Sequence, residues 1–171
     1  MRKIIASIFL VLTFLCSCSE RNEAALDWYN KAVALNYTDP QKAIEYLNNA
    51  IELQDLFAPA YYLRGVNYFK LEQHQRAIED FNLAIILNPS YSDAYQSRGV
   101  AYTTLLQYQR AIENFDKAIN LKPDNIEAYT CRGYVYLNQG NKELGCHDAQ
   151  KACKLGNCKL LEMAIGRGYC G

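Results

Sequence analysis

Seven cysteines carry the most informative chemistry of this chain. Four of them, Cys146, Cys153, Cys158 and Cys170, lie close together at the C-terminus. A high cysteine content is more typical of an exported protein than of a cytosolic one. In an oxidising compartment four neighbouring cysteines indicate two disulfides. We therefore expect the C-terminal segment to be cross-linked.

Helix geometry limits how these four cysteines can pair. Cys146 and Cys153 lie two turns apart on one expected helix, which separates them by roughly 10 Å, whereas a disulfide needs Cα atoms within about 7 Å. A turn at Gly156-Asn157 places Cys153 opposite Cys158, and Cys146 then lies opposite Cys170. We favour this nested arrangement, and the pairs 146–158 and 153–170 remain the alternative. Either one attaches the C-terminal segment to the helix before it.

A metal site is the competing interpretation of the same residues. Cys146, His147, Cys153 and Cys158 offer thiolate and imidazole ligands, but their spacing matches no common zinc pattern. Cys146 and His147 are also adjacent on a helix and so point about 100° apart around its axis. We therefore expect no metal and no other cofactor.

Catalytic motifs are absent from the sequence, which has two histidines and lacks HExxH, GxSxG, CxxCH and a phosphate-binding glycine loop. His74 falls between two expected helices, where a solvated turn residue is the simplest interpretation. Acidic residues such as Glu79 and Glu113 fit solvated helix faces or ion pairs. Cys131 fits a small packed side chain better than a reactive thiol. The sequence therefore predicts a protein that is not an enzyme.

The elements that position these residues follow a repeat. Six residues recur 34 positions later: Gly65, Tyr68, Ala77, Phe81, Ala84 and Pro89 are followed by Gly99, Tyr102, Ala111, Phe115, Ala118 and Pro123. A fixed period of this length is typical of stacked supersecondary units. Apolar residues at helical spacing predict two helices per unit, at about 92–105 and 108–121 in the unit that begins at Ser92. The small residues let the two helices approach closely, and the proline begins the next turn.

These residues resemble the tetratricopeptide repeat (TPR) family. The resemblance covers about 24–155 and implies an all-α fold, a right-handed α-solenoid of about four helix hairpins followed by a short C-terminal capping helix. A degenerate first unit is expected because its outer face has no neighbour to pack against. The units are expected at 24–57, 58–91, 92–125 and 126–157, and the cysteine-stapled cap at 158–171.

The arginine before each repeated glycine is expected to form an ion pair across its hairpin. We expect Arg64 to meet Asp80 and Arg132 to meet Asp148. The corresponding residue of the middle unit is Asn114, so we expect Arg98 to pair with Glu113, Asp116 or a residue of a neighbouring repeat.

The resemblance also implies a concave groove, lined by the first helices, that binds a peptide or a partner protein. The implied groove residues are Tyr62, Val66, Phe69, Lys70, Gln96, Val100, Thr103, Thr104, Thr130, Tyr134, Leu137 and Asn138. Such a mixed aromatic and polar groove suits an extended segment or a partner helix. Tyr62, Val66 and Val100 occupy slots where chaperone-binding members carry a carboxylate clamp, so that C-terminal motif is not the expected ligand. Eighteen basic and 18 acidic residues balance, so no basic field indicates nucleic acid.

The N-terminus has the pattern of an export signal. Arg2 and Lys3 precede an apolar run at 4–15, which is too short to span a bilayer but has the length of a signal peptide core. The segment Leu15-Cys16-Ser17-Cys18 resembles a bacterial lipobox, with Leu at −3, Ser at −1 and Cys at +1.

That resemblance implies that residues 1–17 are removed and that Cys18 is lipidated, with 18–23 as a short tether. An ordinary signal peptide cut nearby is the alternative. Ser19 rather than aspartate follows the cysteine, which favours the outer over the inner membrane. We therefore expect a periplasm-facing lipoprotein of the bacterial envelope that acts as an adaptor or assembly scaffold. A structural protein that self-associates into a homo-oligomer is the alternative.

Overall fold

The computed structural model of this 171-residue chain describes residues 2–171, with side chains described from 19 onward. The expected signal peptide at 1–17 and the expected lipidation site Cys18 lie outside the residues whose side chains are described. Over the described range the chain is helical and has no strand. The helices are α1 (Arg2–Leu35), α2 (Pro40–Leu53), α3 (Ala58–Lys70), α4 (His74–Leu87), α5 (Ser92–Thr104), α6 (Tyr108–Leu121), α7 (Ile126–Asn138), α8 (Lys142–Lys154) and α9 (Lys159–Gly166).

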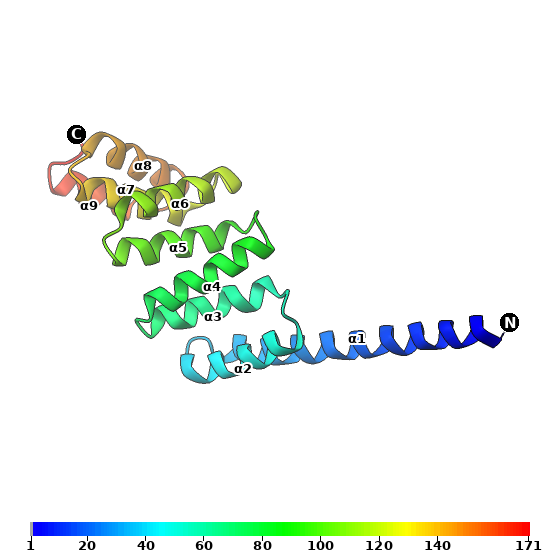
Figure 1. Ribbon diagram of the computed structural model, residues 1–171. Coiled ribbons are helices and arrows are strands. Elements are labelled where there is room, and N and C mark those ends of the chain that lie inside the picture. Colours follow the sequence, from blue (N-terminus) through cyan, green and yellow to red (C-terminus); the bar gives the residue numbers. More distant parts are fainter. Residues whose placement is uncertain (1) are drawn as a thin grey trace.

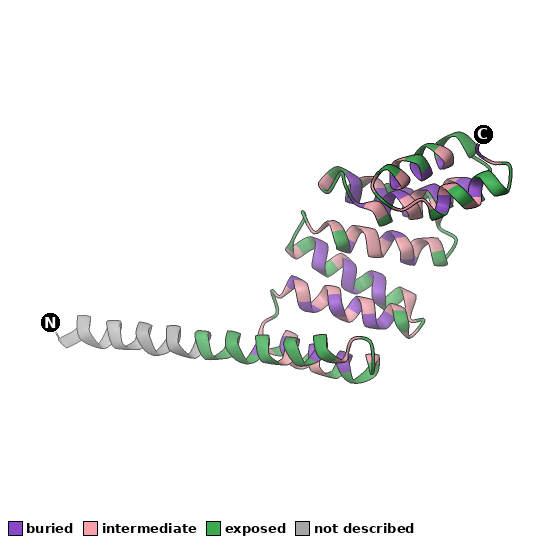
Figure 2. Ribbon diagram, turned by 180° about the vertical axis from the view of Figure 1, so that it is seen from behind, coloured by how far each residue is buried: buried purple, intermediate pink, exposed green. Residues whose placement is uncertain are grey.

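The helices form four consecutive hairpins, each packed on the next. Figure 1 shows them stacked from α1 and α2 at one end to α7, α8 and the short α9 at the other. The buried residues run along the packed faces of α2 to α9, whereas the described part of α1 is largely exposed (Figure 2). This arrangement confirms the predicted all-α solenoid with a C-terminal capping helix. In the part of the chain that is described, no helix combines the length and the apolar character that a bilayer span requires.

The expected tether is not a separate segment in this structure. Residues 19–23 are exposed residues of α1, which continues into the first hairpin without a break. The degenerate first unit packs through Ala32, Ala43 and Leu47, which are fully buried. Its packing residues therefore lie mainly on α2.

The connections follow ordinary turn chemistry. Asn88 precedes Pro89 and ends α4 with φ −137° and ψ 90°, the extended backbone that proline requires of the residue before it. The turn inside each of the last three hairpins uses a left-handed residue at the same repeat position, namely Glu72, Leu106 and Gly140. Only Gly140 takes this conformation without steric cost.

Each of the two middle hairpins is closed by contact between a glycine and an aromatic ring. A Cβ on Gly65 would lie 2.8 Å from the ring of Phe81, and a Cβ on Gly99 would lie 2.7 Å from the ring of Phe115. These distances leave no room for a side chain, so the glycine allows the two helices to pack on a fully buried ring.

The fourth hairpin fills this space from a different helix. Ala149 stands at the position of the aromatic residue, and the nearest side chain to Gly133 is Leu160 of α9, 2.9 Å from the place of a Cβ. Leu160 is 6% exposed. Helix α9 therefore supplies the core side chain that α8 lacks.

Arginines on α3, α5 and α7 join each hairpin to the one before it. Arg64 donates to both carboxylate oxygens of Asp80, each at 2.8 Å, and to Asn48 Oδ1 at 2.8 Å. Asp80 belongs to the same hairpin and Asn48 to the preceding one, 16 residues away in either direction. The predicted pair of Arg64 with Asp80 is confirmed, and its second partner adds a contact between hairpins.

The same geometry recurs at Arg132. This side chain donates to both oxygens of Asp148, at 2.7 and 2.8 Å, and also forms an ion pair with Asp116 of the preceding hairpin. Burial alone would lower the pKa of Arg132, but the hydrogen bonds and charges of Asp148 and Asp116 outweigh it and raise that pKa.

The middle arginine has no carboxylate partner. Arg98 donates to Asn114 Oδ1 at 2.7 Å and to Asn82 Oδ1 at 2.5 Å. Of the expected partners, the neighbouring repeat provides one, Asn82. Asn114 in the arginine's own hairpin also accepts a hydrogen bond from it. Burial lowers the pKa of Arg98, the opposite direction from Arg132.

His74 also differs from the expectation. It is the first residue of α4 and is only partly exposed. Its ring lies 4.9 Å from that of Phe69, so it closes the end of the hairpin by packing and is not a solvated turn residue.

The arginine contacts predict different losses of stability for the same substitution at Arg132 and at Arg98. Arg132→Met should lower the free energy of unfolding by about 3–5 kcal/mol because it leaves the buried carboxylate of Asp148 unpaired. Arg98→Met should cost only about 1–2 kcal/mol because it leaves amides rather than charges without a partner. Urea titration followed by circular dichroism measures both. Equal losses in the two variants would contradict this account of the charges.

Candidate functional site

The first helices of three hairpins, α3, α5 and α7, line a groove with two depressions. The larger has a volume of about 400 Å³ and the smaller a volume of about 120 Å³. Val100 of α5 borders both, so they are neighbours along one groove. The larger depression is lined by Val100, Thr103, Thr104, Phe115, Thr130, Cys131, Tyr134, Lys159, Leu160 and Met163. The smaller is lined by Val66, Phe69, Phe81, Ser97 and Val100.

The hydroxyl groups of the three threonines in the larger depression are already hydrogen-bonded within the protein, so they make its lining less polar than the residue types indicate. Thr103 donates its hydroxyl to Gly99 O at 2.9 Å, Thr104 to Val100 O at 3.2 Å and Thr130 to Ile126 O at 2.8 Å. Each hydroxyl is thus occupied by a carbonyl of its own helix. The methyl groups and the neighbouring aliphatic and aromatic side chains make the depression largely apolar.

Two further side chains define its chemistry. Burial raises the pKa of Cys131 to about 11, so this thiol is protonated at neutral pH and acts as a wall residue. Lys159 at the start of α9 is exposed and is the charged residue of the lining. A ligand would therefore meet an apolar cavity with a positive charge beside it.

Seven of the twelve residues expected in the groove line one of these depressions. They are Val66, Phe69, Val100, Thr103, Thr104, Thr130 and Tyr134. Tyr134 is 47% exposed, which makes it accessible from the groove.

The expectation for Leu137 was wrong, because this side chain is 7% exposed and belongs to the core. Its Cδ2 lies 2.6 Å from the place that a Cβ of Gly145 would occupy. The missing side chain of Gly145 leaves the space that Leu137 fills. The same repeat position carries Phe69 and Thr103 in the earlier hairpins, where an alanine stands in place of Gly145 and both side chains line a depression.

Tyr62 is half-buried and packs under the groove rather than lining a depression. Its ring lies 6.0 Å from that of Phe81 and 4.9 Å from that of Tyr91. Burial raises the pKa of Tyr62. Its main role in this structure is contact between α3, α4 and the turn before α5.

The remaining expected residues are surface residues outside the two depressions. Lys70 donates to Asn36 Oδ1 at 2.9 Å and joins the second hairpin to the first. Gln96 donates to Glu127 Oε2 at 3.0 Å. Asn138 is exposed at the end of α7.

The sequence interpretation missed the residues that α9 contributes, Lys159, Leu160 and Met163. One signal was present, since Ala149 occupies the position of Phe81 and Phe115 and so leaves a core position unfilled. A following apolar segment could have been assigned to that vacancy.

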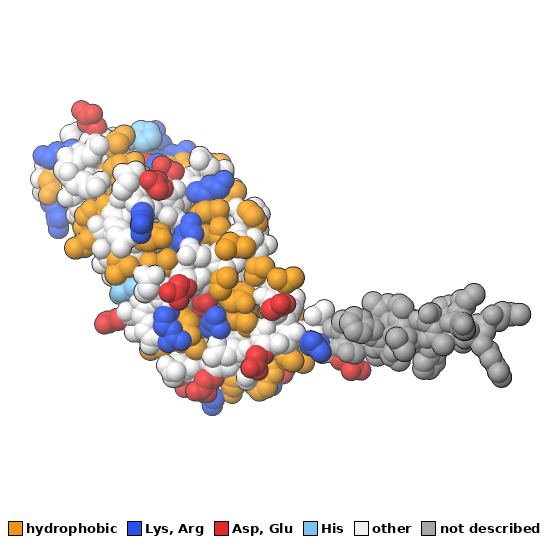
Figure 3. Space-filling view, in the orientation of Figure 1, with side chains coloured by type: hydrophobic (Ala, Val, Ile, Leu, Met, Phe, Trp, Pro, Cys, Tyr) orange, Lys and Arg blue, Asp and Glu red, His pale blue; other side chains and the backbone are white. Residues whose placement is uncertain are grey.

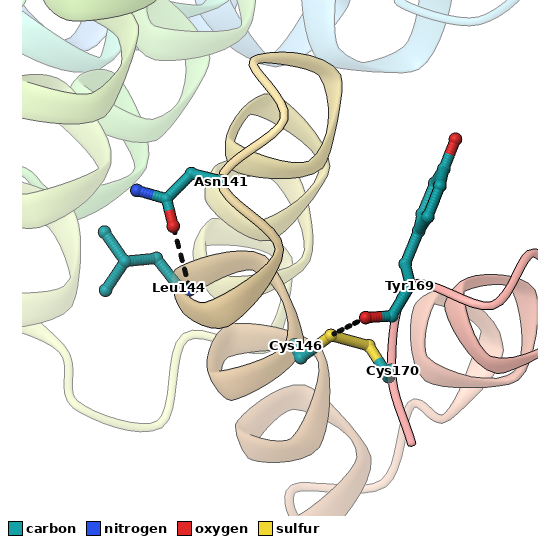
Figure 4. Close-up of a disulfide and its surroundings, with 5 residues drawn as sticks. All are labelled: Asn141, Leu144, Cys146, Tyr169 and Cys170. Carbon is teal, nitrogen blue, oxygen red and sulfur yellow. Dashed lines mark hydrogen bonds between the residues drawn. A yellow bond between two sulfur atoms is a disulfide. The ribbon is translucent and has the colours of Figure 1, made fainter.

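Two disulfides hold α9 and the C-terminal residues. Cys146 is bonded to Cys170, with Cα atoms 5.6 Å apart, and Cys153 is bonded to Cys158. These are the pairs of the nested arrangement. Figure 4 shows the disulfide between Cys146 on α8 and Cys170 in the non-helical segment after α9. The carbonyl oxygen of Tyr169 lies 3.3 Å from Cys146 Sγ. The residues before and after α9 are therefore both linked covalently to α8.

These bonds occupy the cysteines that a metal would need. His147 is 74% exposed and lies 3.6 Å from Asp148. Among the described side chains, no group of His, Cys, Asp and Glu is placed to hold a metal ion. Cys131, on α7, is the free thiol of the described residues.

The face of the molecule drawn in Figure 3 shows no field of one charge sign. On the face drawn in Figure 3, exposed hydrophobic side chains are interspersed with acidic and basic ones. The groove is thus distinguished by its shape and its apolar lining.

Comparisons with known families match two segments of the chain. A family model described as a tetratricopeptide repeat matches residues 58–91, and one described as a TPR repeat matches residues 107–140. No curated protein sequence matches the chain.

Solved structures extend the likeness to most of the chain. The crystal structure of MamA is 30% identical, with a TM-score of 0.73, over 77% of this chain and 77% of that one. The first TPR of Spaghetti (RPAP3), bound to the HSP90 peptide SRMEEVD, is 25% identical, with a TM-score of 0.67, over 70% of this chain and 95% of that one. The structure of pilF from Pseudomonas aeruginosa is 17% identical, with a TM-score of 0.73, over 80% of this chain and 63% of that one, and it shows a shared fold alone.

The disulfides generate a second prediction. Cys146→Ser/Cys170→Ser should lower the free energy of unfolding by about 3 kcal/mol, because this bond closes the longer loop, with a sequence separation of 24. Cys153→Ser/Cys158→Ser removes the bond that closes a short loop, with a sequence separation of 5, and should cost about 2 kcal/mol. Urea titration of the oxidised proteins measures both losses. Non-reducing peptide mass mapping is the control, and four free thiols or crossed pairs would refute the assignment.

Proposed function

Because this chain belongs to the tetratricopeptide repeat family, we propose that it is an adaptor or assembly scaffold that binds a protein or peptide partner while anchored to the bacterial envelope. The observation that carries the binding role is the groove with two apolar depressions across α3, α5 and α7. An exposed concavity of this kind suits a partner segment.

Three features support binding over catalysis. The larger depression is apolar, its threonine hydroxyls are engaged by their own helices, and its thiol has a raised pKa. No nucleophile and base are paired among the residues that line it. What remains available in the groove is shape and one positive charge.

The partner we propose differs from the peptide in the RPAP3 complex. That protein holds an HSP90 peptide, so a fold of this kind accommodates a peptide. Here Tyr62, Val66 and Val100 stand where the family's carboxylate clamp has polar and basic residues. We therefore infer a ligand that is recognised through apolar side chains and not through a terminal carboxylate.

The anchor that we propose is a lipid on Cys18. The support is the sequence Leu15-Cys16-Ser17-Cys18 after a short apolar run. Residue 19 lies on α1 close before the first hairpin, so an anchor at 18 would hold the stack near the membrane surface. We propose an orientation toward the periplasm, with the outer membrane favoured by Ser19.

A structural, self-associating role is the second candidate, and one observation favours it. Leu26 is 50% exposed and Val33 is 46% exposed on α1. Their equivalents 34 positions later, Ala60 and Asn67, are both fully buried. The outer end of the stack thus offers an apolar face that a second copy could cover.

Metabolic labelling with a fatty acid tests the anchor. The wild-type chain should become labelled and fractionate with membranes, and Cys18→Ala should lose the label. Cys16→Ala serves as the matched control and should keep it. An unlabelled wild-type chain would refute the lipid anchor but would not contradict the proposed binding role of the groove.

Site-specific photo-crosslinking in the cell envelope tests the adaptor role. A photoreactive residue at Tyr134, in the larger depression, should capture a partner protein that the same residue at exposed Ile86 on α4 does not. A third position, Leu26, reports contact at the outer end of the stack. Capture of only a second copy, at Leu26 or at Tyr134, would favour the structural role over the adaptor.

A further inference from the structure

The two depressions of the groove are built on one plan and differ in size. A buried aromatic ring lies at the base of each, Phe81 in the smaller and Phe115 in the larger. Because these rings belong to successive repeats, the depressions are one repeat apart. Neighbouring packed helices lie about 8–10 Å apart, so two side chains of a ligand about 10 Å apart could enter both.

One repeat position and helix α9 account for the difference in size. Phe69 occupies it in the second hairpin and lines the smaller depression. In the third hairpin Thr103 occupies it, and this smaller side chain widens the cavity. Leu160 and Met163 of α9 extend the apolar wall on the far side, so the larger depression continues past the last complete repeat.

The two depressions also differ in charge, which sets the orientation of a bound segment. Lys159 is the charged residue of the larger depression, whereas the lining of the smaller one carries no charge. A carboxylate beside the larger depression would be attracted to the ammonium group of Lys159. Charge complementarity therefore distinguishes the two ends of the groove.

We propose that the groove recognises a segment of a partner protein that carries two apolar anchors and one acidic residue. A bulky apolar side chain enters the larger depression and an acidic residue next to it pairs with Lys159. A small apolar side chain enters the smaller depression. In a segment with polyproline II conformation three residues complete one turn and span about 9 Å. Two residues three positions apart then present their side chains on the same side, so the small anchor lies three residues from the bulky one. This inference rests on the proposed binding function and specifies its ligand.

A display library of random linear peptides, selected on the full chain purified in detergent, tests the pattern. The enriched peptides should share a bulky apolar residue, an adjacent Asp or Glu, and a small apolar residue three positions from the bulky one. Enrichment of peptides without this pattern, or of none, would overturn the proposal. So would displacement of an enriched peptide by oleate alone, since that would assign the cavity to an acyl chain.

Two variants test whether an enriched synthetic peptide binds in the larger depression. The indole of Thr104→Trp should fill the entrance of the larger depression. The affinity for the peptide should then fall about tenfold or more, because the bulky anchor can no longer be buried there. Lys159→Glu should weaken binding of the acidic peptide and spare its amide analogue. Glu113→Trp and Lys117→Glu, at exposed positions of α6, are the matched controls and should bind as the wild type does.

The same variants separate this inference from the proposed function. If Thr104→Trp binds the enriched peptide unchanged, the anchor assignment is wrong. The crosslinking experiment with the photoreactive residue at position 134 can be repeated in the Thr104→Trp variant. If that variant captures the same partner as efficiently, the adaptor role stands, but its ligand does not enter the larger depression. Circular dichroism of each variant checks that the stack is intact.

Discussion

The close contact between a glycine and an aromatic ring inside each of the two middle hairpins is the constraint on which this structure depends. At Gly65 and Gly99 even a methyl group would overlap the ring of Phe81 or Phe115. The two helices of a hairpin are therefore as close as their backbones allow, and each ring is fully enclosed. This closeness also fixes the arginine just before each glycine. From that position it reaches a partner 16 residues ahead and another 16 residues behind.

The end of the stack shows what happens when one member of that contact is missing. Ala149 cannot fill the space beside Gly133, and Leu160 of α9 enters it. The capping helix is thus a component of the fourth core and not a covering added to a complete domain. A helix of eight residues has little stability alone, so its position depends on this leucine and on the bonds of Cys146 and Cys153.

The sequence predicted the parts of the structure that a repeat encodes. The expected helices at 92–105 and 108–121 match α5 and α6 closely, and the pairs of Arg64 and Arg132 followed from their spacing. The misses were at positions where a repeat departs from its own pattern. Leu137 shares a position with groove residues, but Gly145 opposite it opens the core. That outcome depends on which two residues face each other across the hairpin, which the composition of either helix does not show.

The polarity of the groove was also misjudged for a physical reason. Thr103, Thr104 and Thr130 make the lining appear polar when residue types are counted. On a helix each hydroxyl can donate to the carbonyl one turn back, as these three do. A ligand then meets their methyl groups. Helix α9 also lines this depression, so Leu160 both completes the fourth core and borders the larger depression. The shape of the groove is therefore coupled to the packing of the C-terminal cap, and through Cys146–Cys170 and Cys153–Cys158 to an oxidising environment.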